Sequence, residues 1–242
     1  MNAFDGGGNL VSPRHLRKMY SAYERVQDAK PFQGEEKLSA FAPDLGRAHG
    51  ELADATVRWG ELYSSMMFGN LVHTSTVLLK RERLRAVGFF EESYKTGEDY
   101  DFHLRTCFEG PVALLDVPCI RYRIAGGADQ LTSPKHQLEI ARNGLRIREV
   151  ALARDRSKIA LSDAELGKIM ARANAWVAHE LFEQGNFEDA RRYFRRAGLF
   201  GDPKAATLLK ASIAHLPSAV AGSVMALIRK AKGKTKTTGA SG

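Results

Sequence analysis

Apolar positions recur at helical spacing near the start of the chain and give way to short β-branched runs further on. In residues 12–28, large apolar side chains return every three or four positions. Ser12 and Pro13 suit a helix start, so this pattern predicts a helix. Residues 30–58 are more polar, carry prolines and show no firm period. We expect loop with short helical pieces there.

From Asn70 to about residue 130, short β-branched segments alternate with short amphipathic ones. Gly88 closes one helical segment, and an acidic stretch opens another that runs to about Phe108. The expected elements are strands at 71–79, 111–118 and 119–124, helices at 80–88 and 96–108, and a glycine turn at 125–129. This alternation predicts an α/β fold with a mixed sheet.

In the second half of the chain the pattern is helical. Amphipathic helices are expected at 136–154, 162–185 and 186–200, and a capping box of Ser162 and Glu165 opens the second. Small and aromatic residues in this region are spaced as in a tetratricopeptide-type hairpin. Because only one such unit is present, we favour an ordinary helical hairpin that caps the domain over a peptide-binding array.

The last segment joins an amphipathic helix to a basic run, in which five of the eight residues 229–236 are positively charged. The large apolar positions of this helix are Val220, Val224, Leu227 and Ile228. Such a helix could lie on an anionic membrane surface, but we favour packing on the hairpin. The chain thus divides into three expected parts, residues 1–130, 131–215 and 216–242.

Composition narrows the class of protein. The hydrophobic content of 44% allows a core, and no apolar run approaches the roughly 18–20 residues of a membrane span. The N-terminus has no secretory signal pattern, and the two cysteines form no disulfide or metal pattern. A reduced, cytoplasmic setting is expected, with peripheral contact at the inner membrane as a variant. Although the net charge is +8, the basic residues cluster in a tail without aromatic residues, which argues against a nucleic-acid binder.

Residues 96–106, TGEDYDFHLRT, crowd three carboxylates together. One interpretation is structural: Thr96 and Asp99 have the spacing of a capping box, and Asp101 and Arg105 are placed for an ion pair along a helix. The other interpretation is that the acids face a substrate. The segments around the stretch decide between the two.

Five short motifs follow one another in this region. In chain order they are TVLLKRERL, GFFEE at 88–92, EDYD at 98–101, Leu104-Arg105 and Tyr122-Arg123. In this order and at these intervals, residues 72–124 resemble the acceptor-side half of family 2 glycosyltransferases, inverting enzymes with a GT-A, Rossmann-like fold. The resemblance implies a partial GT-A domain followed by an all-helical region.

The resemblance also implies roles for individual residues. Inverting transfer needs a carboxylate that takes the proton of the acceptor hydroxyl. The aspartate of the family's ED pair has this role, and it corresponds to Asp99. Glu98, Asp101, Arg105 and Arg123 would bind substrate. The implied partners are a nucleotide-sugar donor and a glycan or lipid-linked acceptor.

The chain departs from the family at the cation site. Family members hold Mg²⁺ or Mn²⁺ with an Asp-x-Asp motif that ends their nucleotide-binding half. In the matching segment FDGGGNLVSPRHL only Asp5 remains acidic, and Tyr122-Arg123 is not followed by the family's histidine. No metal ligand is therefore assigned, and the donor-binding half is expected to be missing.

Two classes of function follow. The leading hypothesis is a glycosyltransferase, or its acceptor-binding half, that transfers a sugar from a nucleotide-sugar donor with inversion. The alternative is a non-catalytic binding protein derived from such an enzyme, which uses its helical hairpin for protein interaction.

Overall fold

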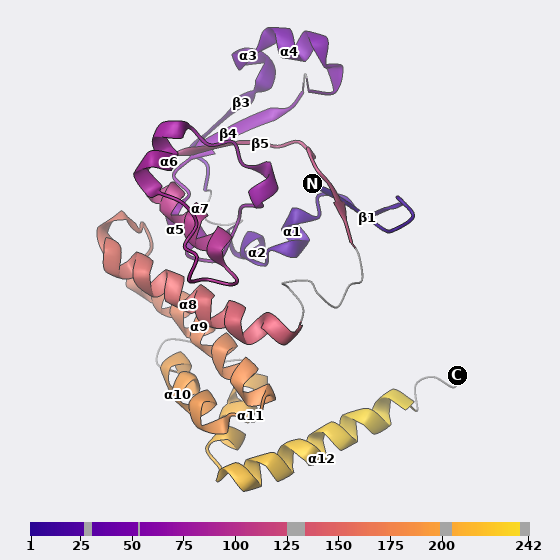
Figure 1. Ribbon diagram of the computed structural model, residues 1–242, viewed down its shortest axis with the longest axis vertical. Coiled ribbons are helices and arrows are strands. Elements are labelled where there is room, and N and C mark those ends of the chain that lie inside the picture. Colours follow the sequence, from indigo (N-terminus) through magenta and orange to yellow (C-terminus); the bar gives the residue numbers. More distant parts are fainter. Residues whose placement is uncertain (27–30, 53, 125–133, 199–204, 238–242) are drawn as a thin grey trace. The chain divides into compact units, whose positions relative to one another are not determined.

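The computed structural model describes residues 1–26, 31–52, 54–124, 134–198 and 205–237. The chain is a mixed α/β protein with about 60% helix and small sheets (Figure 1). Its contacts define two compact units, Met1–Ser133 with Arg146–Leu161 and Pro134–Leu145 with Ser162–Gly242. The sequence predicted boundaries at residues 130 and 215. The observed division differs from them, because the two halves of helix α8 (Gln137–Arg154) belong to different units.

Two three-stranded sheets organise the first unit. The strands are β1 (Asn2–Phe4), β2 (Leu10–Ser12), β3 (Gly34–Lys37), β4 (Thr56–Gly60), β5 (Val112–Leu115) and β6 (Arg121–Arg123). One sheet has the order β2-β1-β6, in which β1 is antiparallel to β2 and parallel to β6. The other has the order β3-β4-β5 and is antiparallel throughout. Because β1 and β6 are parallel neighbours, the segments that follow them leave the sheet at the same edge.

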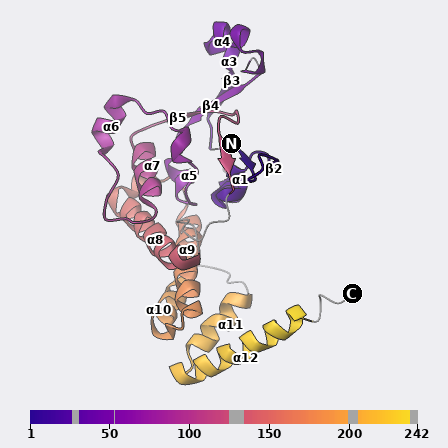
Figure 2. The same ribbon diagram turned by 45° about the vertical axis from the view of Figure 1, so that its right-hand side comes forward.

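Short helices surround these sheets. They are α1 (Leu16–Met19), α2 (Ala22–Val26), α3 (Leu38–Phe41), α4 (Pro43–Ala48), α5 (Tyr63–Met66), α6 (Arg81–Val87) and the 3₁₀ turns Gly50–Leu52, Thr74–Thr76 and Arg156–Lys158. Both ribbon views show α3 and α4 together beyond the ends of β3 and β4 (Figures 1 and 2).

The longer helix α7 (Glu98–Phe108) forms the core of the first unit. It is buried on most of its circumference, and the Tyr100 hydroxyl donates to the Met66 carbonyl at 2.6 Å. From α8, the Arg148 guanidinium lies over the Tyr100 ring and Nε donates to the Met67 carbonyl at 2.8 Å. A helix enclosed in this way can hold the side chains of its first turn in a fixed orientation.

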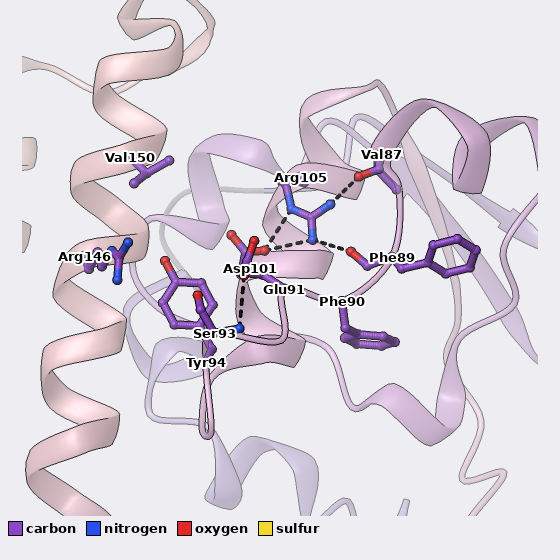
Figure 3. Close-up of a pocket in the computed structure, with 10 residues that line it drawn as sticks. All are labelled: Val87, Phe89, Phe90, Glu91, Ser93, Tyr94, Asp101, Arg105, Arg146 and Val150. Carbon is purple, nitrogen blue, oxygen red and sulfur yellow. Dashed lines mark hydrogen bonds and ion pairs between the residues drawn. The ribbon is translucent and has the colours of Figure 1, made fainter.

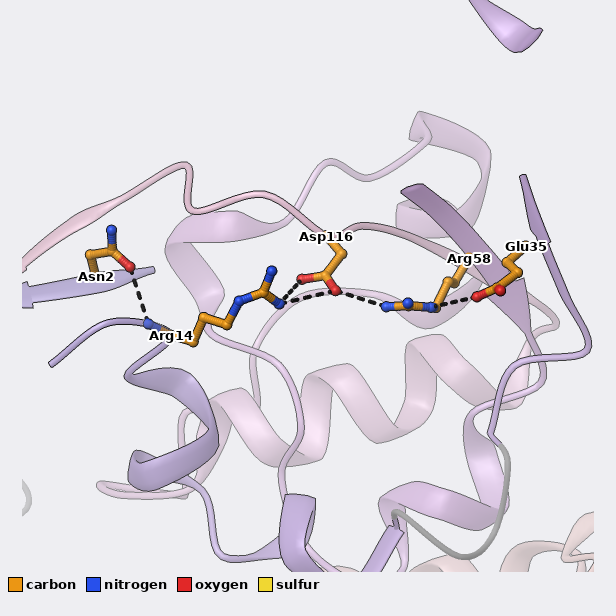
Figure 4. Close-up of polar contacts among 5 residues, drawn as sticks. All are labelled: Asn2, Arg14, Glu35, Arg58 and Asp116. Atoms are coloured by element: carbon orange, nitrogen blue, oxygen red, sulfur yellow. Dashed lines mark hydrogen bonds and ion pairs between the residues drawn. The ribbon is translucent and has the colours of Figure 1, made fainter. Parts of the chain in front are cut away.

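A chain of charged side chains joins the two sheets (Figure 4). Asp116, in the β5–β6 connection, accepts from Arg14 at 3.0 Å and from Arg58 at 2.7 Å. Arg58 also donates to Glu35 at 2.9 Å, and the backbone N–H of Arg14 donates to Asn2 at 3.1 Å. Burial alone would raise the pKa of Asp116, but hydrogen bonds and charges from Arg58 and Arg14 lower it overall. The network ties the β5–β6 connection to both sheets.

Several sequence predictions for the first unit are confirmed. Helices α6 and α7 stand where residues 80–88 and 96–108 predicted them, with Gly88 ending α6 at φ +76°. Strands β5 and β6 fall within 111–118 and 119–124. The glycine turn expected at 125–129 lies outside the described residues.

The helix predicted for residues 12–28 is wrong. Ser12 pairs with Ala3 in the β2–β1 ladder, and Arg14 takes a left-handed conformation at φ +48°, so α1 and α2 are short and separate. The prediction for residues 30–58 was partly wrong, because β3 and β4 stand there besides the short helices. Both errors concern short strands whose pairing the local apolar pattern does not reveal.

The strand predicted at 71–79 is also wrong. In this fully described segment, Thr74–Thr76 form a 3₁₀ turn and the remaining residues are irregular. Leu78 is fully exposed and Val77 is 36% exposed. β-branched residues indicate a strand only where a neighbouring strand and a packed face are available, and here neither is.

The second unit is helical. Helices α9 (Asp163–Glu183) and α10 (Phe187–Gly198) form the expected hairpin, followed by α11 (Ala205–Ala214) and α12 (Ser218–Thr237). The capping box is present: the Glu165 N–H donates to Ser162 Oγ at 3.2 Å and the Ser162 N–H to Glu165 Oε2 at 2.9 Å. Phe182 is completely buried, with Phe187 edge-on to its ring at 5.3 Å. The hairpin is confirmed, while its tetratricopeptide likeness stays a prediction.

The first half of α12 packs on this helical core. Ala221 and Met225 are buried, with Val224 and Ile228 packed beside them, whereas Leu227 is 69% exposed. Most of the basic run lies outside the residues whose side chains are described, so membrane contact through the tail stays a prediction. Within the described part of the chain, no helix combines the length and apolar character of a membrane span.

Candidate functional site

Asp99 occupies the first turn of α7 with both carboxylate oxygens engaged. Oδ1 accepts from the Tyr100 backbone N–H at 2.7 Å, and Oδ2 accepts from the Asn70 side chain at 3.0 Å. The expected capping box is wrong: Gly97, in a left-handed conformation at φ +84°, is the N-cap, and Thr96 is buried. Asn70 and the first-turn N–H of Tyr100 thus hold the Asp99 carboxylate in one orientation.

The pKa of Asp99 is raised above its ordinary value. Burial is the main cause and raises the pKa, while backbone N–H groups and Asn70 lower it by a smaller amount. A carboxylate with a raised pKa is a stronger base, which is what proton abstraction from a hydroxyl requires.

Two tyrosines and two histidines belong to the surroundings of this carboxylate. The charge of Asp99 acts on His73 and contributes to raising the pKa of Tyr20, whose main cause is burial. Burial lowers the pKa of His73, which keeps the imidazole neutral near pH 7. His73 meets the Tyr122 ring edge-on at 5.9 Å, and His15 stacks on the same ring at 5.9 Å. This cluster, Asp99 with Tyr20, His73, His15 and Tyr122, links the start of α7 to strand β6.

The cluster contains two buried imidazole nitrogens. Among the described residues, Nδ1 of His15 and Nδ1 of His73 are buried without a hydrogen-bond partner. Buried polar atoms are usually paired, so such atoms are commonly satisfied by water or a ligand. Asn70, Tyr20 and His15 stand in no motif that would mark them as neighbours of Asp99.

A separate cavity of about 620 Å³ lies on another face of α7 (Figure 3). It is lined by Val87, Phe89, Phe90, Glu91, Ser93, Tyr94, Asp101, Arg105, Arg146 and Val150. Arg105 Nε donates to Asp101 at 2.8 Å, and its terminal nitrogens donate to the carbonyls of Val87 and Phe89. The ion pair expected between Asp101 and Arg105 is therefore confirmed, and it holds the loop after α6 against α7.

The predicted site residues consequently divide between two places. Asp99 is not among the residues that line this cavity, because positions 99 and 101 point about 200° apart around a helix. Asp101 and Arg105 are at the cavity and engage each other. Glu98 is partly exposed beside Asp99, and Arg123 is exposed on β6.

His103 is only 2% exposed. Its Nε2 lies 3.3 Å from the Thr74 hydroxyl. Burial, with a smaller contribution from His73, lowers the pKa of His103 to about 4. This histidine is therefore a neutral part of the core.

The turn at residues 5–9 does not fit the divalent cation that the family resemblance implies. The Asp5 carboxylate accepts from the backbone N–H groups of Gly7 and Asn9, both at 2.9 Å, and from the Asn9 side chain. These bonds lower the pKa of Asp5, with the Asn9 side chain as the first cause. Among the described residues, no group of three His, Cys, Asp or Glu could hold a metal ion. The Asp5 carboxylate therefore stabilises its own turn.

Comparisons of the chain with protein families, with characterised proteins and with solved structures find no significant match.

The raised pKa of Asp99 predicts how Asp99→Asn changes stability with pH. Since the folded pKa lies above the unfolded value, the stabilisation linked to Asp99 is fully present below about pH 3.8 and is lost as pH rises through the folded pKa. Asp99→Asn should therefore become more stable relative to the wild type as pH rises through this window. Urea unfolding of both proteins across it measures the difference.

Asp155→Asn is the control of opposite sign for this experiment. The pKa of Asp155 is lowered, first by its hydrogen bond to Ser157, so its stabilisation is present above the unfolded pKa and lost as pH falls. Its variant should lose stability relative to the wild type as pH rises. A stability difference for Asp99→Asn that is flat or falls with pH would contradict a desolvated carboxylate at residue 99.

Proposed function

We propose that this chain is the acceptor-side part of an inverting, nucleotide-sugar-dependent glycosyltransferase of the family 2, GT-A type. One observation carries the proposal: the aspartate of the ED motif is an oriented, partly desolvated carboxylate, whereas the other acid of EDYD, Asp101, is paired within the structure. The two acids thus have the different environments that a base and a structural anion require.

The arrangement of β1 and β6 supports the same proposal. The parallel pairing sets Phe4 beside Arg123, so the turn that begins at Asp5 and the chain beyond the Tyr-Arg motif leave the same edge of the sheet. In open α/β sheets, ligands bind outside the carboxyl ends of parallel strands. Tyr122, through its contact with His73, joins this edge to the surroundings of Asp99.

The proposed step is a single displacement. The acceptor hydroxyl oxygen forms a bond to the anomeric carbon while the bond from that carbon to the diphosphate oxygen breaks, and the electron pair leaves with the nucleoside diphosphate. The hydroxyl proton passes to the carboxylate of Asp99. The Asn70 amide, bonded to Oδ2, and the Tyr100 N–H, bonded to Oδ1, fix the orientation of this carboxylate.

Release of nucleoside diphosphate tests this function. The purified chain is incubated with nucleotide sugars, with or without glycan and lipid-linked acceptors, in Mg²⁺, Mn²⁺ or chelator. We expect release that depends on the acceptor, with weak donor binding because Asp5 is the only acidic residue in the segment that matches the family's cation site. Absence of acceptor-dependent release across the panel would contradict the activity.

The second candidate is a non-catalytic binding protein that uses the hairpin of α9 and α10. The observation in its favour is that the turn at residues 5–9 has a single carboxylate, Asp5, which is hydrogen-bonded within its own loop. Acceptor binding without turnover, together with capture of a defined protein through the hairpin, would favour this candidate.

A further inference from the structure

The second unit contains a cluster of arginines that the proposed transfer activity does not use. A cavity of about 100 Å³ is lined by Arg142 of α8 and by Asp189, Arg192, Tyr193 and Arg196 of α10. The four α10 residues recur at i, i+3, i+4 and i+7, so they form one face of the helix. Arg142 lies in the half of α8 that belongs to the same unit.

This cavity carries an excess of positive charge. Asp189 is its single acidic residue, and its carboxylate is already engaged by the Asn186 side chain at 2.9 Å and by Arg192 at 3.5 Å. Within the described residues, neither Arg142 nor Arg196 lies within ion-pair distance of a carboxylate. Arg196 instead lies over the Tyr193 ring at 5.5 Å, which holds its guanidinium beside the cavity. Like charges brought together on a folded surface favour binding of an anion.

From this convergence we propose that the cavity between α8 and α10 binds a phosphate group. Its volume suits one small oxyanion and falls well below the roughly 300–1,000 Å³ of sites for drug-sized ligands. One arginine satisfies a carboxylate through two parallel hydrogen bonds, whereas a phosphate offers more oxygens and a second charge. Three guanidinium groups therefore match a phosphate better than a carboxylate. The site lies in the second unit and does not depend on Asp99.

Titration calorimetry of the full chain with inorganic pyrophosphate, at low ionic strength, tests the proposal. Saturable binding is expected, and Arg142→Ala and Arg196→Ala should each weaken it about tenfold or more, the usual worth of a charged hydrogen bond. Both arginines are exposed, so these variants should keep the urea midpoint of the wild type. Acetate at matched ionic strength should not compete.

Arg195→Ala is the matched control, because Arg195 is exposed on the same helix and does not line the cavity. It removes the same charge one position away, and its affinity for pyrophosphate should change by less than about threefold, as expected for screened charge alone. An equal loss of pyrophosphate affinity in Arg195→Ala would mean that general positive charge accounts for binding, and it would contradict the proposed site. Absence of saturable binding, or equal binding of acetate, would also overturn it.

A second arm identifies the source of the phosphate. Sedimentation with vesicles that contain phosphatidic acid is compared between the wild type and Arg142→Ala. Loss of vesicle binding in the variant assigns the cavity to lipid phosphates, while unchanged vesicle binding with lost pyrophosphate binding assigns it to soluble phosphates. Asp99→Asn should bind pyrophosphate like the wild type, so failure of the transfer reaction would leave this inference intact.

Discussion

Asp99→Asn is expected to lower the rate of glycosyl transfer by about 10²–10⁴-fold, the usual contribution of a positioned base. Asparagine keeps the size of the side chain and one acceptor oxygen for Asn70 or the Tyr100 N–H, but it cannot take up the proton. Because the substitution removes a transition-state interaction, kcat should fall with little change in the KM for the acceptor. Steady-state kinetics with saturating nucleotide sugar measure both constants.

The matched control for this substitution is Glu149→Gln, which removes an exposed acid of α8 in the same unit. It should retain the wild-type rate. Far-UV circular dichroism should show both variants folded, so that the loss in Asp99→Asn reports chemistry. A rate for Asp99→Asn within about threefold of the wild type would show that the carboxylate has no part in the mechanism.

The pattern of the chain predicts elements that depend on local signals. Gly88 ends α6, Ser162 and Glu165 open α9, and the apolar face of α10 is buried as its spacing requires. The contacts at Gly88 and Ser162 lie within one helical turn, whereas the apolar face of α10 packs against other helices of the second unit. Strands β1 to β4 escaped prediction because they are short and pair with segments that a sequence does not place beside them.

The candidate site shows the same limit. Asp99 was found through a motif, and its ion-paired neighbour Asp101 through i, i+4 spacing with Arg105. Burial is the main cause that raises the pKa of Asp99, and Asn70 and His73, from a loop earlier in the chain, lower it by smaller amounts. Sequence spacing indicates the pairing of Asp101 with Arg105, but it does not show the environment of Asp99, in which desolvation raises the pKa of the carboxylate.

Arg105→Ala is expected to lower the free energy of unfolding by about 3–5 kcal/mol, the cost of leaving a buried ion without its partner. The Arg105 guanidinium bonds to Asp101 and to the carbonyls of Val87 and Phe89, and Asp101 is only 9% exposed. Alanine leaves this carboxylate uncompensated and detaches the loop that follows α6. Urea unfolding at pH 7 measures the loss.

Two comparisons separate this interaction from a general effect of charge. Arg85→Ala removes an exposed arginine of α6 and should change stability by no more than about 0.5 kcal/mol. In the double variant with Asp101→Ala, no buried charge remains, so the loss should be clearly smaller than the sum of the two single losses. Strict additivity, or a loss below about 1 kcal/mol for Arg105→Ala, would mean that the pair is solvated in solution and that the loop is held by its apolar contacts alone.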